Sequence, residues 1–75
     1  MSSERGTVVE FDERRGLGVV VATDGTGRPF HCAQIADGTR TIRVSTEVFY
    51  SVGPGPLGVW EAVALVPISM GAPAR

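Results

Sequence analysis

The stretch LGVVVATDGTGRPFHC, residues 17–32, carries the strongest structural signal in the chain. Asp24-Gly25 suits a tight hairpin turn, because the central residues of such a turn need positive φ angles. Apolar and β-branched residues precede and follow this turn, as they do in strands. We therefore expect a strand over residues 17–22 and an antiparallel strand over residues 28–32.

Outward from this hairpin, glycine and proline punctuate the chain at short intervals, and the segments between them favour strands. The polar turn over residues 12–16 ends in a glycine, as tight hairpins require. Gly53-Pro54-Gly55-Pro56 predicts a loop, because proline lacks the donor that a strand ladder needs. The other expected elements are a strand over residues 7–11, a short helical turn over residues 33–36, and strands over residues 47–52 and 59–66.

Five short antiparallel strands with a longer connection after the third predict an all-β fold, a small five-stranded antiparallel Greek-key barrel. Closure of the barrel would remove exposed strand edges. An SH3-like barrel is the competing architecture. A chain of 75 residues supports one core, so we expect a single domain over residues 6–67, a flexible N-terminus over 1–5 and a flexible tail over 68–75.

Composition limits the function further. Seven basic and eight acidic residues give a net charge of −1, which argues mildly against a partner held mainly through phosphates. The lone Cys32 excludes an internal disulfide and a cysteine-rich zinc site. No apolar run approaches the roughly 20 residues that span a bilayer, and the N-terminus lacks an apolar signal region. We expect a cytoplasmic protein without a membrane partner.

From Gly6 to about Val66 the chain resembles the bacterial cold-shock domain, an oligonucleotide-binding (OB) barrel. Residues 6–12, GTVVEFD, are similar to the family's opening motif Gly-x-Val-x-Trp-Phe-Asn. Residues 15–20, RGLGVV, resemble its first nucleic-acid motif, Lys-Gly-Phe-Gly-Phe-Ile, and residues 28–35 resemble its second, Val-Phe-Val-His-Phe followed by Ser-Ala-Ile. The resemblance implies a cold-shock-like OB fold that binds single-stranded RNA or DNA, without catalysis and without a cofactor.

Cold-shock domains hold single strands mainly by stacking bases on exposed aromatic rings, each stack contributing roughly 1–3 kcal/mol. The positions that match those rings are not aromatic here: Glu10, Leu17, Val19, Pro29, Cys32 and Thr39. Glu10 also repels phosphate. The resemblance therefore implies weakened or altered binding. The residues expected to line the nucleic-acid site are Phe11, Arg15, Leu17, Val19, Arg28, His31 and Arg40.

Two alternatives stay open for these residues. In one, Phe11 packs at the barrel rim and the arginines only solvate loops. In the other, outward aliphatic groups such as Val9, Leu17 and Val19, with Phe49, form an apolar face for a homodimer or a protein partner. Trp60 would then be either a core or rim residue or an anchor of that interface.

His31 and Cys32 suggest no further chemistry. A metal site needs three or four converging ligands, and the chain offers one histidine, so we expect no metal. A phosphate contact of His31 would strengthen in mild acid. Adjacent strand residues point to opposite faces, so the two side chains should not meet. No nucleophile, base and carboxylate follow a catalytic spacing, so we expect no enzyme.

Overall fold

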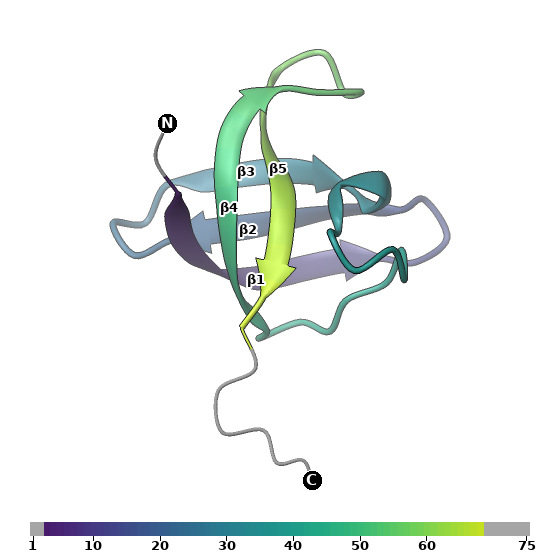
Figure 1. Ribbon diagram of the computed structural model, residues 1–75, viewed down its shortest axis with the longest axis horizontal. Helices are drawn as coiled ribbons and strands as arrows, with labels where there is room; N and C mark the ends of the chain where they lie inside the picture. The colour runs from purple at the N-terminus through teal and green to yellow at the C-terminus, as the bar shows by residue number, and fades with distance from the viewer. Residues whose placement is uncertain (1–2, 69–75) are drawn as a thin grey trace, which may run out of the picture.

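The computed structural model describes residues 3–68, which form five strands and one short helical turn (Figure 1). The elements are β1 Glu4–Asp12, β2 Leu17–Ala22, β3 Gly27–His31, the 3₁₀ helix η1 Cys32–Gln34, β4 Glu47–Pro54 and β5 Trp60–Pro67. All the strand pairs are antiparallel, and the strand order in the sheet is β3-β2-β1-β4-β5. The expected all-β fold of five antiparallel strands is confirmed.

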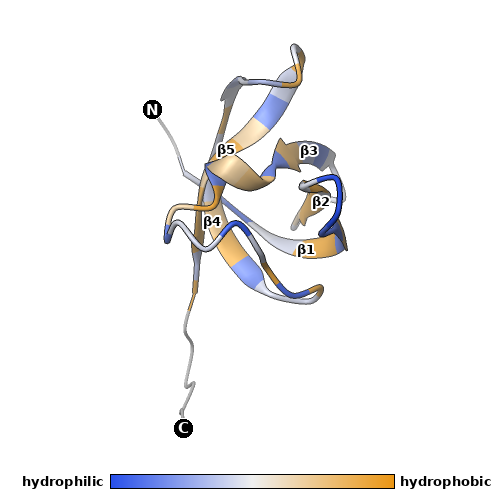
Figure 2. Ribbon diagram, turned by 90° about the vertical axis from the view of Figure 1, so that its right-hand side faces the viewer, coloured by the Kyte–Doolittle hydropathy of each residue, from blue (hydrophilic) through white to orange (hydrophobic). Residues whose placement is uncertain are grey.

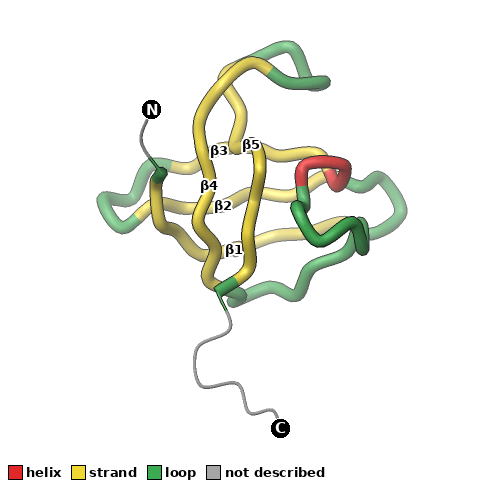
Figure 3. Tube along the Cα trace, in the orientation of Figure 1, coloured by secondary structure: helices red, strands yellow, loops and turns green. Residues whose placement is uncertain are grey.

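Strand β1 joins two layers of the sheet. Residues 4–7 pair with β4, and the ladder with β2 extends from Gly6 to Asp12. A bulge at Val9 shifts the register between Val8 and Glu10, and such bulges bend and twist a strand. As a result β4 and β5 cross the layer of β1, β2 and β3 (Figures 1 and 3).

The two edge strands, β3 and β5, are not joined by a ladder within residues 3–68. The predicted barrel is therefore curled but not closed by hydrogen bonds. The C-terminal part of the β5 edge is covered instead by the segment after η1, where the Ala36 amide donates to the Leu65 carbonyl at 2.7 Å.

Alternation along the strands builds the core. Hydrophobic and hydrophilic stretches follow one another along the strands (Figure 2), and every second residue of a strand faces the same side. The buried apolar residues are Val8, Val20, Phe30, Ile35, Val48, Tyr50, Ala62 and Leu65. Gly18 lies on the same side, and a Cβ there would come within 2.5 Å of Phe30 Cζ. Glycine therefore leaves room for the largest ring of the core.

The structure corrects one expected loop. Strand β4 does not stop at Val52 but continues to Pro54, and Gly53 and Pro54 pair with Glu61 and Trp60. The expectation failed because a proline at the end of a strand loses only its own N–H, while its carbonyl and its neighbours still fit the ladder.

The strand boundaries differ from the expected ones at other ends. β1 begins at Glu4 and not at Thr7, because Glu4 and Arg5 pair with Tyr50 and Phe49 of the distant β4. η1 starts at Cys32, one residue before the expected helical turn. The flexibility expected for residues 1–5 and 68–75 stays a prediction, and residues 1–2 and 69–75 lie outside the described part of the chain.

Candidate functional site

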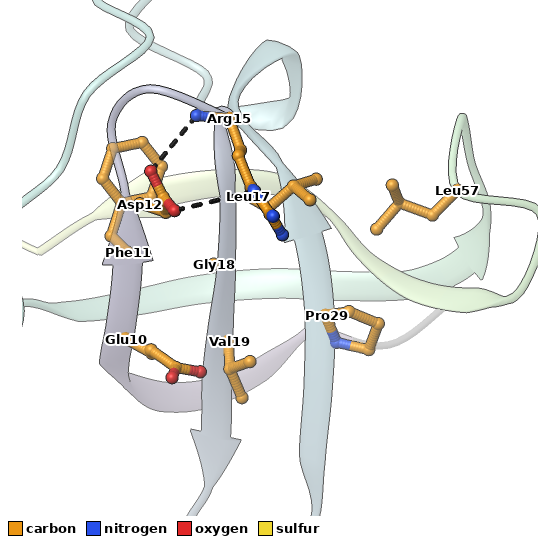
Figure 4. A pocket seen from close by; sticks show the side chains of 9 residues that line it. All are labelled: Glu10, Phe11, Asp12, Arg15, Leu17, Gly18, Val19, Pro29 and Leu57. Carbon is orange, nitrogen blue, oxygen red and sulfur yellow. Dashed lines mark hydrogen bonds and ion pairs between the residues drawn. The ribbon is translucent and has the colours of Figure 1, made fainter.

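An open groove of about 330 Å³ lies on the outer face of β1, β2 and β3. Most of its lining comes from these strands and the turn over residues 13–16, and Leu57 of the β4–β5 loop stands opposite Leu17 and Pro29 (Figure 4). The full lining is Glu10, Phe11, Asp12, Arg15, Leu17, Gly18, Val19, Pro29 and Leu57. The groove thus brings together two parts of the chain that are distant in sequence.

Cross-strand pairing gathers the aliphatic wall of the groove. Val19 lies opposite both Glu10 of β1 and Pro29 of β3, and Leu17 lies opposite His31. Directly opposite residues share one face of a sheet. Because Val20 faces the core, its neighbour Val19 must face outward, and Leu17, two positions away, shares that face.

Asp12 organises the turn and the only arginine of the groove. One of its carboxylate oxygens accepts hydrogen bonds from the amides of Arg14 at 3.0 Å and Arg15 at 3.2 Å. Its other oxygen lies 4.0 Å from Arg15 Nε. The Arg15 side chain then extends beside Leu17 at one end of the groove (Figure 4). The groove cation is therefore partly neutralised by its own neighbour.

Glu10 lies at the other end of the groove, beside Val19 (Figure 4). Within residues 3–68 its carboxylate makes no hydrogen bond and no ion pair. A carboxylate offers acceptors only. Glu10 is therefore available as an acceptor at the end of the groove opposite Arg15, which is paired with Asp12.

The buried Glu61 holds the Leu57 backbone in place at one side of the groove. It lies in β5 with no exposed surface, and its Oε2 accepts a hydrogen bond from the Leu57 amide at 2.5 Å. A Cβ at Gly55 would lie 2.8 Å from Glu61 Cδ, so the glycine makes room for the carboxyl group. Among the described residues, Glu61 Oε1 has no hydrogen-bond partner.

Both Leu57 and Glu61 were missed by the sequence reasoning. The resemblance to the cold-shock domain predicted groove residues on β1 and β2 and in the turn between them, whereas Leu57 reaches the groove only through the pairing of β4 with β5. The available signal was a single acidic residue, Glu61, within the otherwise apolar strand over residues 59–66. Buried carboxyl groups are rare without a structural or functional reason.

Four of the seven predicted site residues meet in the groove: Phe11, Arg15, Leu17 and Val19. The Phe11 ring is half-buried and lies parallel to Phe30, with 5.9 Å between the ring centres. Phe11 therefore packs at the rim, as the first alternative held, while it also lines the groove.

The structure does not bring Arg28 into the groove. Arg28 pairs with the inward Val20 and lines a second pocket of about 130 Å³ with Glu4, Asp24 and Tyr50. Burial, and then the charges of Glu4 and Asp24, raise the pKa of the Tyr50 hydroxyl. This second pocket is mixed in charge and belongs to another part of the barrel.

His31 and Arg40 occupy different surroundings. His31 ends β3 next to Leu17, and its Nδ1 accepts a hydrogen bond from the Ala33 amide at 3.0 Å, which caps η1. Arg40 is exposed in the connection before β4, at a positive φ of 61°, and does not line the groove. Among residues 3–68, Arg15 is thus the single arginine of the groove.

The prediction that His31 and Cys32 do not meet is wrong. Cys32 Sγ lies 3.9 Å from His31 Nδ1. Strand alternation ends at His31, because the backbone turns into η1 at the next residue.

Several large apolar side chains are exposed. Phe49 is 43% exposed between the buried Val48 and Tyr50, which confirms that it points outward. Trp60 is 64% exposed and Val59 53% exposed, so the indole is not a core residue. The others are Val9, Val44 and Val66.

Residues 3–68 contain no helix of the length and apolarity that crossing a membrane requires. In the same residues, no three histidine, cysteine or acidic side chains come together as metal ligands would.

No protein-family model matches the chain, and no curated protein does. Among solved structures, the chain is similar to a Drosophila chain described as Unr CSD456, with a TM-score of 0.74 and 21% sequence identity. The match covers 95% of this chain and 29% of that chain, so this chain spans less than a third of it. This likeness to a cold-shock-domain structure confirms a cold-shock-like OB fold, in place of the SH3-like alternative.

Proposed function

We propose that this protein binds single-stranded RNA or DNA in the groove on β1, β2 and β3, with weak to moderate affinity and without catalysis. The groove itself carries the proposal, because Phe11, Arg15, Leu17 and Val19 line one open site on a cold-shock-like OB fold. The resemblance to the cold-shock domain matches two of these residues, Leu17 and Val19, to positions of base-stacking rings.

The composition of the groove accounts for modest affinity. Leu17, Val19 and Pro29 offer apolar contact to a base but no π surface on which it can stack. Arg15, the only arginine among the described groove residues, forms an ion pair with Asp12, and Glu10 repels phosphate. We infer that one phosphate contact, and little stacking, holds the strand.

Fluorescence anisotropy of labelled oligopyrimidines and oligopurines of about eight nucleotides tests this proposal, since one OB fold covers roughly 4–16 nucleotides. We expect binding at low salt that weakens as salt is added. Arg15→Gln should lower the affinity and reduce the salt dependence by about 0.7 log units per log unit of salt, the amount expected for one phosphate of a single strand.

Arg14→Gln is the matched control. Arg14 is exposed in the same turn and carries the same charge, but its side chain does not line the groove. It should leave binding nearly unchanged. Absence of binding by the unsubstituted protein at low salt would contradict the proposal.

The exposed side chains favour a second function, a homodimer or a protein-docking module. Trp60 and Val59 lie side by side in sequence next to the hairpin tip that carries Leu57, and both are more than half exposed. Aromatic residues in such positions often anchor interfaces. Light scattering over a concentration series tests self-association, which Trp60→Ser should abolish. A monomer at high concentration excludes the homodimer.

A further inference from the structure

We propose that the groove selects bases that carry an exocyclic amino group, such as cytosine, over uracil and thymine, and that Glu10 makes this selection. The inference rests on the proposed single-strand binding and deepens it.

The groove suits one flat ring. Its volume of about 330 Å³ is at the lower end of the range of small-molecule sites. Leu57 lies on one side, and Leu17 and Pro29 lie on the other (Figure 4). A base between these side chains has its apolar faces covered by aliphatic carbons, and its polar edge points along the groove.

Polar discrimination then falls to Glu10. Asp12 already accepts hydrogen bonds from two amides and lies against Arg15, and Arg15 is drawn toward it. Gly18 lies in the sheet between its partners Phe11 and Phe30. Among the described residues that line the groove, Glu10 is the only acidic side chain that accepts no hydrogen bond and forms no ion pair. The Arg15 guanidinium at the other end offers donors only, and its one contact is the ion pair with Asp12.

A carboxylate distinguishes amino from carbonyl groups because it accepts hydrogen bonds and cannot donate them. Cytosine presents its N4 amino donor at the position where thymine, like uracil, presents the O4 acceptor. The amino group can bind Glu10, whereas the carbonyl oxygen faces a second acceptor and stays unsatisfied.

The two ends of the groove also set the direction in which a nucleotide enters. Arg15 and Glu10 lie at opposite ends (Figure 4). Arg15 attracts the phosphate, and Glu10 repels it and attracts the amino edge. A nucleotide that satisfies both therefore enters with its backbone toward the turn over residues 13–16 and its base edge toward Val19 and Glu10.

Oligo(dC) and oligo(dU) of equal length, compared at neutral pH and low salt, test this inference. The two bases differ at position 4, which Glu10 is proposed to read, and at the neighbouring N3, so the Glu10 variant below is needed to assign the preference. We expect the protein to bind oligo(dC) about five- to tenfold more tightly, as one hydrogen bond to a charged, exposed side chain allows.

Glu10→Gln should reduce this preference to less than about twofold, because an amide can donate to O4 or accept from N4. Glu13→Gln is the matched control. It removes a charge of the same sign from the turn between β1 and β2, outside the groove. The glutamine can still accept the hydrogen bond that Thr41 Oγ1 donates to Glu13. This variant should keep the preference for oligo(dC).

The outcomes separate the two proposals. Equal binding of both strands, or a preference that persists in Glu10→Gln, would overturn the role of Glu10 and leave single-strand binding intact. Failure of both strands to bind would overturn the proposed function itself and would favour a protein occupant of the groove.

Discussion

At the scale of single residues, the groove differs from an aromatic nucleic-acid face in its side chains, which are mainly aliphatic. Val19 and Leu17 point outward from β2 where the resemblance places stacking phenylalanines. An aliphatic group covers a base edge or face, but it lacks the π surface that makes stacking tolerant of sequence. A ring at one of these positions should therefore recover affinity.

Val19→Phe tests this expectation. The side chain lies on an open face between Glu10 and Pro29, so a ring fits without displacing the core. We expect oligonucleotide affinity to rise about five- to a hundredfold, which corresponds to one stack of roughly 1–3 kcal/mol. Anisotropy titration measures it.

Val21→Phe is the control for Val19→Phe. Val21 is also half-buried on the outward side of β2 but lies outside the groove, opposite Thr7 and Gly27. Its substitution should leave affinity unchanged. An equal gain from both variants would show that general apolar area, and not the groove, governs binding.

At the scale of elements, the β4–β5 hairpin supplies the second side of the groove through one buried contact. The Leu57 amide donates to Glu61 Oε2, and Glu61 lies in β5 beneath the loop. Without this acceptor, the loop loses the hydrogen bond that fixes Leu57 opposite Leu17. Glu61 therefore acts as a positioning residue.

Glu61→Ala should expose the Leu57 amide to exchange while the sheet remains protected. We expect its exchange in NMR to accelerate by about two- to tenfold, since one hydrogen bond stabilises by about 0.5–1.5 kcal/mol. Glu61→Gln retains an acceptor and should keep most of the protection. Unchanged Leu57 exchange in Glu61→Ala would refute this role.

The elements also show what the sequence could and could not predict. Asp24-Gly25 identified the β2–β3 hairpin, and alternation placed Phe49 outward, because both depend on local geometry. The outward positions of Leu17 and Val19 came from the resemblance to the cold-shock domain. The bulge at Val9 has no local signal. Neither has the pairing of Pro54 with Trp60, which brings Leu57 to the groove. These features depend on the register in which strands distant in sequence pair, and no local sequence pattern specifies that register.

At the scale of the whole molecule, a small core stabilises a strongly curved sheet. One core residue, Tyr50, carries a hydroxyl group that can lose a proton at alkaline pH. Tyr50 is 2% exposed and adjoins the second pocket. Because its pKa is raised in the folded state from an ordinary value of 10.0, the folded protein keeps a proton that the unfolded chain loses. Stability is therefore expected to fall as pH rises above that ordinary value.

Tyr50→Phe should remove this part of the alkaline loss. At neutral pH its free energy of unfolding should change by no more than about 1 kcal/mol, since the ring is kept and the hydroxyl has no hydrogen-bond partner among the described residues. Urea unfolding at neutral pH and above about pH 10 measures both effects. An equal decline in both proteins would exclude Tyr50 as its cause.

The bulge in β1 has a consequence for how this fold can change in length during evolution. Loss of one residue within a regular stretch of strand turns every later side chain to the opposite face. Loss of Val9 would instead leave Val8 opposite Val20 and Glu10 opposite Val19, so the ladder stays in step. Bending of the strand would be reduced, and related chains could therefore differ by a deletion at this one position of β1.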